Sequence, residues 1–131
     1  MAQGELIHER LTHSVIGAFF EVYNVLGFGF LEQIYLDALA IELRDRGHVV
    51  DREVSVRVRY KGANIGWQRV DIIVDNTLVV EVKSTTELHS SARRQLRNYL
   101  CATRLKLGLL LHFGPTARFY RLVGGAAASM V

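Results

Sequence analysis

Three charged residues interrupt apolar stretches of the chain that otherwise predict buried β-strands. Asp71 lies between Val70 and Ile72, and Glu81 and Lys83 alternate with valine in the segment VVEVK. Because side chains in a strand alternate between the two faces of a sheet, Glu81 and Lys83 are predicted to share one face. A charge removed from water must be paired, hydrogen-bonded or bound to a metal. These residues therefore indicate a catalytic or metal site, and a Glu–Lys ion pair with Asp71 in a turn is the alternative.

The turn between the two strands decides whether the two carboxylates lie on the same face. With a three-residue loop at 75–77, Asp71 stands opposite Glu81. A two-residue loop at 75–76 pairs Asp71 with Val80 instead and places the carboxylates on opposite faces. A metal site at Asp71 and Glu81 thus requires the odd-length loop or an equivalent bulge.

Two carboxylates and an amine on one face suit hydrolysis of a phosphodiester with the help of a divalent cation. Hard oxygen ligands, with room for water and a phosphate oxygen, favour Mg²⁺ or Mn²⁺ over Zn²⁺. Lys83 is then placed to orient or deprotonate the attacking water, or to stabilise the charge that develops on the phosphate.

The spacing of apolar side chains predicts the elements that must hold these residues. Helical periodicity predicts helices over residues 5–26, 31–47 and 87–104. Alternating or continuous apolar runs predict strands over residues 54–60, 65–74, 78–83, 106–114 and 117–123. The order, two helices, three strands, a helix and two strands, predicts an α/β fold with a mixed sheet flanked by helices. Tyr35, Trp67 and Phe113 are expected in its core.

The bulk composition is that of a folded protein. Half of the 131 residues are hydrophobic and 22% are charged, which argues against a disordered chain and favours one domain over 1–131, with 124–131 as a frayed tail. The sequence has no apolar run of the ~18 residues that a membrane span needs, and it starts without signal-peptide features, so we expect a cytoplasmic protein without a membrane partner. A net charge of +3 is compatible with a polyanionic partner.

Two groups of basic residues are candidates for contact with such a partner. Arg93, Arg94 and Arg97 form a basic stripe on the predicted third helix, which suits either phosphate contacts or a solvated helix face. The basic residues within 57–61 lie on one face of a strand, where solvation or protection of a sheet edge is favoured over contact with DNA.

Two motifs resemble those of a known nuclease family. Asp71 followed by Glu81-Val82-Lys83 resembles the D…E-x-K signature of the PD-(D/E)xK nuclease superfamily. Upstream, the segment GFLEQIY places Gly29, Glu32 and Tyr35 in the motif G-x-x-E-x-x-Y, which names the GxxExxY proteins, a bacterial and archaeal family of that superfamily. The resemblance runs over roughly residues 5–123 and includes both motifs.

The resemblance implies a restriction-endonuclease-like fold and a Mg²⁺- or Mn²⁺-dependent enzyme that hydrolyses DNA, with RNA as a further candidate substrate. It implies that Asp71, Glu81 and Glu32 bind the metal and that Lys83 serves the water or the phosphate. Without the resemblance, Glu32 reads as a solvated helix carboxylate. The alternative function is a non-catalytic nucleic-acid-binding or assembly module that retains the fold, and a homodimer is compatible with either.

The third helix carries a further likeness. Gln95 and Tyr99 resemble the Q-x-x-x-Y motif of the RecB-like branch of the superfamily. Residues four apart lie on the same face of a helix, so both side chains are expected to reach the metal-bound water or the nucleic acid.

Overall fold

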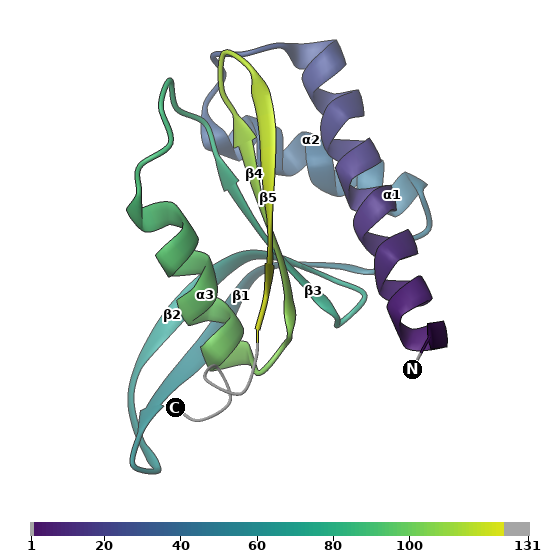
Figure 1. Ribbon diagram of the computed structural model, residues 1–131. Helices are drawn as coiled ribbons and strands as arrows, with labels where there is room; N and C mark the ends of the chain where they lie inside the picture. Colours follow the sequence, from purple (N-terminus) through teal and green to yellow (C-terminus); the bar gives the residue numbers. More distant parts are fainter. Residues whose placement is uncertain (1, 125–131) are drawn as a thin grey trace.

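The computed structural model describes residues 2–124, with side chains from residue 8 onward, so the predicted tail falls almost wholly outside the described residues (Figure 1). Its helices and strands are α1 (Ala2–Leu26), α2 (Glu32–Asp45), β1 (Val50–Tyr60), β2 (Ala63–Val74), β3 (Leu78–Lys83), α3 (Ser91–Thr103), β4 (Leu107–Phe113) and β5 (Ala117–Val123). No helix in this part of the chain is long and apolar enough to cross a membrane.

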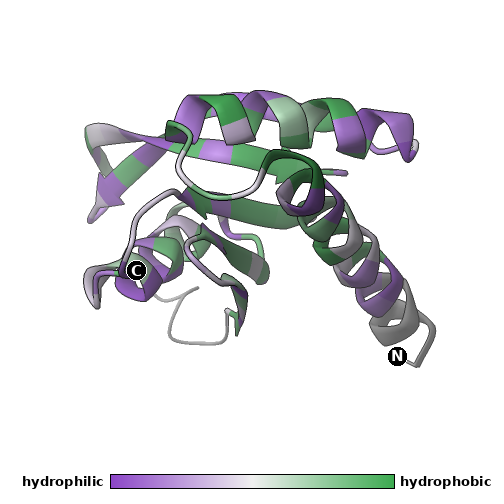
Figure 2. Cartoon of the chain, turned by 90° about the horizontal axis from the view of Figure 1, so that it is seen from above, coloured by the Kyte–Doolittle hydropathy of each residue, from purple (hydrophilic) through white to green (hydrophobic). Residues whose placement is uncertain are grey.

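The strands form one mixed sheet in the order β1-β2-β3-β4-β5. The β3–β4 pair is parallel and the other three pairs are antiparallel. A parallel pair needs a crossover connection, and α3 supplies it. Apolar side chains of α1 and α2 cover one face of the sheet and those of α3 cover the other. Figure 2 shows hydrophobic residues dominating the central strands and alternating with hydrophilic ones along the helices. The predicted α/β fold and element order are confirmed.

Three boundaries differ from those that the sequence predicts. The third helix begins at Ser91 instead of residue 87, because the His89 ring accepts the backbone N–H of Ser91 at 3.0 Å and ends the preceding loop there. The first strand begins four residues earlier than expected, at Val50. The turn between β1 and β2 consists of Lys61 and Gly62 alone, both at positive φ.

Trp67 is not a core residue, and its predicted burial is wrong. Its side chain is 57% exposed, whereas Tyr35 and Phe113 are fully buried as predicted. The cause lies in the length of β1 and β2, which extend as a two-stranded arm beyond the other strands (Figure 1). Among the residues that the structure describes, none forms a second layer over this part of the arm, so Trp67 stays exposed.

The β2–β3 hairpin has the register that the two carboxylates require. Val74 pairs with Leu78, so the turn consists of Asp75, Asn76 and Thr77, and the odd-length loop is confirmed. Asp75 and Asn76 both have φ of 52°, a left-handed conformation that Asp and Asn tolerate better than other non-glycine residues. The Thr77 N–H closes the turn by donating to the Val74 carbonyl at 3.0 Å.

A hydrogen-bond network anchors this turn to the N-terminal helix. The Asp75 carboxylate accepts the Val49 N–H at 2.8 Å and contacts the His48 Nδ1 at 2.8 Å. The other ring nitrogen of His48 lies 2.7 Å from the Ser14 hydroxyl on α1. The side chains of Asp75, His48 and Ser14 therefore join the turn to the start of β1 and to α1.

We expect Asp75→Ala to lower the free energy of unfolding by about 1–3 kcal/mol, because it removes both contacts and places alanine at positive φ. Urea denaturation measures the effect. Asp51→Ala, an exposed position on β1, is the matched control and should change stability by less than about 0.5 kcal/mol. Equal losses in the two variants would show that the network does not hold the turn.

Candidate functional site

The regular alternation of β2 breaks at Asp71. Val70 packs in the apolar cluster beneath α3, whereas Ile72 packs in the cluster beneath α1 and α2. In a regular strand these two residues would share a face. On the neighbouring strand, Glu53 lies between the paired positions opposite Val70 and Ile72 and has φ of 51°. The two strands thus bend together, and Asp71 lies at the bend.

Asp71 and Glu81 bind each other's strands through their side chains. The backbone pairing of β2 with β3 extends as far as Ile72 and Val80. One residue further, the Asp71 N–H donates to Glu81 Oε1 at 3.1 Å, and the Val82 N–H donates to Asp71 Oδ2 at 3.0 Å. The carboxylates therefore take the place of backbone carbonyls where the strands separate, and they lie close together.

Burial and mutual repulsion make this pair electrostatically costly. Glu81 is only 3% exposed. Its burial, and next the charge of Asp71, raise the pKa of Glu81 to about 8, while Lys83 opposes the rise. The pKa of Glu32 is raised as well, first by burial and then by Asp71, with Lys83 again opposing. The charges of Asp71 and Lys83 therefore act on both Glu32 and Glu81, with opposite signs.

We expect Glu81→Gln to stabilise the metal-free protein at pH 8. The raised pKa means that the folded state holds the Glu81 proton more tightly than the unfolded state does. Its contribution to stability is complete below pH 4.5, the ordinary value, and is lost as pH rises through about 8. Glutamine is neutral throughout and still accepts the Asp71 N–H, so its gain at pH 8 should be about 1–3 kcal/mol.

Thermal unfolding in a chelator between pH 5 and pH 8 checks this expectation. Glu21→Gln, an exposed position on α1, makes the same chemical change outside the site. The wild type and the Glu21 variant should lose stability alike over this range, and the Glu81 variant should lose less. Parallel curves for all three proteins would contradict a charged, buried Glu81.

The loop before α2 places Glu32 where the charges of Lys83 and Asp71 act on it. Gly27 and Gly29 both adopt positive φ, at 73° and 115°. The Tyr35 hydroxyl accepts the Phe30 N–H at 3.3 Å and donates to the Gly27 carbonyl, so it holds the loop from inside. Glycine and tyrosine of the G-x-x-E-x-x-Y motif therefore shape the loop that precedes the glutamate. The sequence predicted a core position for Tyr35, and the structure adds this contact.

The same loop is tied to the end of β3. Ser84 directly follows Lys83 in the chain, and its hydroxyl donates to the Phe30 carbonyl at 2.5 Å. A backbone hydrogen bond from Ser84 also reaches Glu32, the first residue of α2. Sequence reasoning did not single out Ser84, because a serine after a strand is an ordinary loop residue.

Gln95 and Tyr99 reach the site from α3. Tyr99 is 5% exposed, and burial, followed by the charges of Glu81 and Asp71, raises the pKa of its hydroxyl. A side-chain hydrogen bond joins Tyr99 to Gln95, one turn earlier. The predicted shared face of these two residues is therefore the face of α3 that meets the carboxylates.

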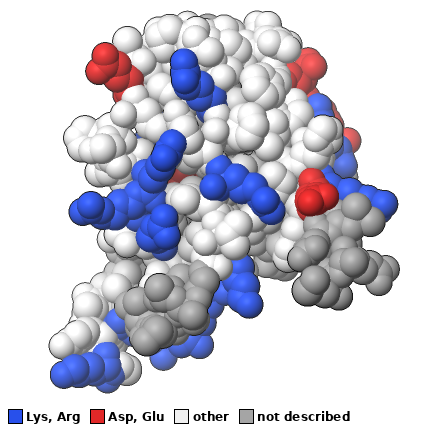
Figure 3. All heavy atoms as spheres, viewed as in Figure 1, with Lys and Arg blue, Asp and Glu red and all other residues white. Residues whose placement is uncertain are grey.

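The three arginines of α3 lie on its exposed side. Arg93, Arg94 and Arg97 are solvent-exposed, and Figure 3 shows Lys and Arg side chains gathered over this helix. Arg93 lies 4.1 Å above the ring of Tyr120 on β5, which fixes its direction by a cation–π contact. None of the three therefore lies on the buried face of α3 that carries Tyr99.

One buried polar residue supports the loop that follows Lys83. His112 on β4 pairs with Lys83 in the parallel register and is 5% exposed. Its Nε2 lies 2.8 Å from the Thr85 carbonyl and 3.0 Å from the Thr85 hydroxyl. These contacts give His112 a structural function at the end of β3.

The donor set suits a hard divalent cation. Asp71, Glu81 and Glu32 offer only carboxylate oxygens, and burial, with the charge of Asp71 as a smaller cause, raises the pKa of Glu81 and Glu32, so a bound cation would favour their charged forms. Among the side chains that the structure describes, no three from His, Cys, Asp and Glu are grouped closely enough to hold a metal together. The central pair is therefore the core of the site, and Glu32 must approach it to act as a third ligand.

Comparisons with known proteins give two findings. The family model described as PD-(D/E)XK nuclease superfamily matches residues 9–122. Among solved structures, the crystal structure of SSO0001 matches with a TM-score of 0.58 and 20% sequence identity, over 70% of this chain and 49% of that one. The chain thus spans about half the length of that protein, and the likeness shows a shared fold. No curated protein matches the chain.

Proposed function

Because the chain belongs to the PD-(D/E)XK nuclease superfamily, we propose that it is a metal-dependent nuclease that hydrolyses DNA phosphodiester bonds. Members of this superfamily generally use divalent metals, and their substrates are nucleic acids. The observation that carries the proposal is the pair of the buried Glu81 and the half-buried Asp71, each of which accepts a backbone N–H from the other's strand, next to the charge of Lys83. A pair this costly to stability is best explained by chemistry that requires it.

Each charged residue of the site has a distinct function in this proposal. Asp71 and Glu81, with Glu32 as a third ligand, hold Mg²⁺, and Mn²⁺ can replace it. The bound ion supplies a Lewis acid that lowers the pKa of water and offsets charge on the phosphate. Lys83 orients the attacking water or neutralises the developing negative charge. Burial of the site beneath α3 limits access of bulk water and strengthens these interactions.

The remaining residues position the substrate. Gln95 and Tyr99 donate hydrogen bonds toward the phosphate or its water, and Arg93, Arg94 and Arg97 attract the backbone from the exposed side of α3. The G-x-x-E-x-x-Y motif and the Gln95–Tyr99 pair support a place in the GxxExxY family, with likeness to the RecB-like branch. A homodimer would present two such sites to the two strands of a duplex.

The test is cleavage of linear, circular, single-stranded and flapped DNA, and of RNA, in Mg²⁺, in Mn²⁺ and in a chelator. Cleavage that requires the metal and is lost in Glu81→Ala supports the proposal. Cleavage of RNA alone would move the substrate from DNA to RNA. Binding of nucleic acid with no cleavage under any condition would make the chain a non-catalytic module that retains the fold.

A further inference from the structure

The arm formed by β1 and β2 carries a concentration of positive charge. Residues 54–70, here called the β-arm, contain four of the 16 Lys and Arg residues and none of the 13 Asp and Glu residues. The rest of the chain therefore has 12 basic against 13 acidic residues, so the arm accounts for the net positive charge of the protein. In Figure 3 the described surface at the lower left, where the arm extends, shows Lys and Arg and no acidic side chain.

Exposed aromatic side chains lie among these charges. Trp67 is 57% exposed and Tyr60 is 61% exposed. The Arg57 guanidinium lies 5.1 Å from the centre of the Trp67 ring, and the Lys61 amine lies 5.3 Å from that of Tyr60. A cation on one face of a ring holds the ring in place. The exposed remainder of Trp67 is then a fixed apolar surface that faces solvent.

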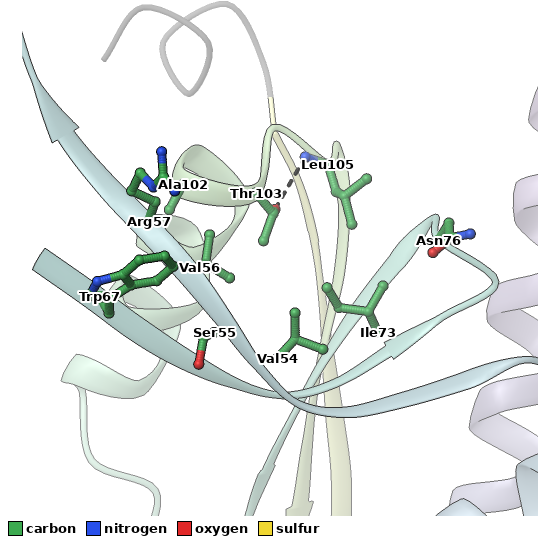
Figure 4. A pocket seen from close by; sticks show the side chains of 10 residues that line it. All are labelled: Val54, Ser55, Val56, Arg57, Trp67, Ile73, Asn76, Ala102, Thr103 and Leu105. Atoms are coloured by element: carbon green, nitrogen blue, oxygen red, sulfur yellow. Dashed lines mark hydrogen bonds between the residues drawn. The ribbon is translucent and has the colours of Figure 1, made fainter. Parts of the chain in front are cut away.

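A groove runs from Trp67 along the inner side of the arm. It has a volume of about 420 Å³ and lies between the arm and the end of α3, where Ala102 and Leu105 line it. Figure 4 shows Trp67 and Arg57 toward one end of this groove and Asn76 at the other. The lining is apolar at its centre and basic at the Trp67 end, which suits a ligand with flat apolar groups and negative charges.

The arm is continuous with the catalytic residues. Trp67 and Asp71 both lie on β2, four residues apart. At about 3.3 Å per residue this spacing is about 13 Å along the strand, close to the length of four stacked nucleotides at 3.4 Å each. The spacing therefore allows a nucleic-acid strand bound at Asp71 to reach Trp67 along β2.

We propose that the β-arm binds a single-stranded stretch of the nucleic acid next to the site of cleavage. One base stacks on the open face of Trp67, and Arg57, Arg59 and Lys61 contact the flanking phosphates. A base within a duplex is already stacked between its neighbours, so only an unpaired base can occupy this ring face. This inference rests on the proposed nuclease function. It restricts the substrate of that nuclease to nucleic acid with an unpaired segment.

Trp67 is the only tryptophan of the chain, so its fluorescence reports on the arm alone. The probe is an oligothymidylate of about 12 nucleotides, within the range of single-strand binding sites. The comparison ligand is a blunt-ended duplex of the same oligothymidylate and its complementary oligodeoxyadenylate, which has no unpaired bases. Both are titrated into the wild type in a chelator, so binding is measured without cleavage. We expect the single strand to quench the fluorescence and the blunt duplex to leave it nearly unchanged.

Substitutions then separate stacking from charge, with binding followed by the anisotropy of a labelled single strand. Trp67→Leu should weaken binding about 5- to 50-fold, and Trp67→Phe should restore most of it. Arg59→Gln/Lys61→Gln should lower the slope of binding against salt by about 1.4, at about 0.7 for each phosphate contact on a single strand. Arg10→Gln/Arg118→Gln removes the same charge from exposed positions on α1 and β5 and is the matched control.

Two results would overturn the proposal. The first is an unchanged Trp67 fluorescence at saturating single strand. The second is that Arg59→Gln/Lys61→Gln has the same slope of binding against salt as its control, Arg10→Gln/Arg118→Gln. A change in oligomeric mass in Trp67→Leu, with binding intact, would assign the arm to contact between copies of the chain instead. If the arm binds as expected but no substrate is cleaved, the proposed catalysis fails and the binding surface stands.

Discussion

Asp71→Asn should reduce the rate of DNA cleavage by about 10³-fold or more while the protein remains folded. The amide oxygen can still accept the Val82 N–H, which holds the ends of β2 and β3 together. What is lost is one negative oxygen donor beside Glu81, and with it the charge complementarity for a divalent cation and for the developing transition state. The effect therefore falls on catalysis and metal binding, and the fold is retained.

Two measurements on the same variant separate these contributions. Wild type should gain about 2.7 kcal/mol of stability when Mg²⁺ is present at 100 times its dissociation constant, and Asp71→Asn should gain almost none. Single-turnover cleavage gives the rate. Asp51→Asn, an exposed position on β1, controls for loss of a negative charge and should keep both properties. An Asp71 variant that cleaves within tenfold of the wild type would remove Asp71 from the site.

Phe113→Ala should lower the free energy of unfolding by about 3–5 kcal/mol, the largest stability effect that we expect from one substitution. Phe113 is fully buried at the end of β4. Its ring stacks on Tyr35 at 4.1 Å between centroids and meets Phe19 edge-on at 4.8 Å. It thus joins the sheet to both α1 and α2. Since small domains are stable by only about 5–15 kcal/mol, this loss is a large fraction of the total.

The same substitution should reach the site through Tyr35. Without the stacked ring, Tyr35 loses its support, and its hydroxyl holds the loop that precedes Glu32. Cleavage under conditions where the variant is still folded should therefore also decrease. Phe28→Ala, whose side chain is 43% exposed, is the control and should cost less than about 1 kcal/mol. A loss for Phe113→Ala no greater than that of the control would contradict this account of the core.

The sequence limited the strand register to two possibilities, because the faces of Asp71 and Glu81 depend on whether the loop has an odd or an even number of residues. Charged residues at alternating positions, and a turn rich in Asp and Asn, admit only two arrangements of Asp71 and Glu81. The structure has the one with the three-residue turn. The choice between them was beyond the sequence, because His48 and Ser14, far away in the chain, hold Asp75 in its conformation.

The bend at Asp71 could not be predicted. The segment from Val70 to Ile72 reads as regular alternation, and local sequence gives no reason for a strand to change faces there. The bend depends on Glu53 on the neighbouring strand, which adopts positive φ without being glycine. Long-range pairing decided the conformation of both residues.

The exposure of Trp67 could not be predicted from the sequence either. A single large aromatic residue in an alternating strand is usually buried, and hydrophobicity alone gave that prediction. Trp67 is exposed because β2 extends beyond β3, β4 and β5. This extension depends on the length of β2 relative to those strands. The exposure of Trp67 is visible only once all five strands are placed.

Lys83→Ala gives the most direct test of the central claim that this site hydrolyses phosphodiester bonds. Single-turnover cleavage of a labelled DNA with an unpaired segment is measured in Mg²⁺, alongside the shift in unfolding temperature that Mg²⁺ causes. Because Lys83 is not a metal ligand in this account, we predict that the variant keeps the metal-induced shift and loses cleavage by about 10²–10³-fold. Cleavage at the wild-type rate by Lys83→Ala would contradict the account.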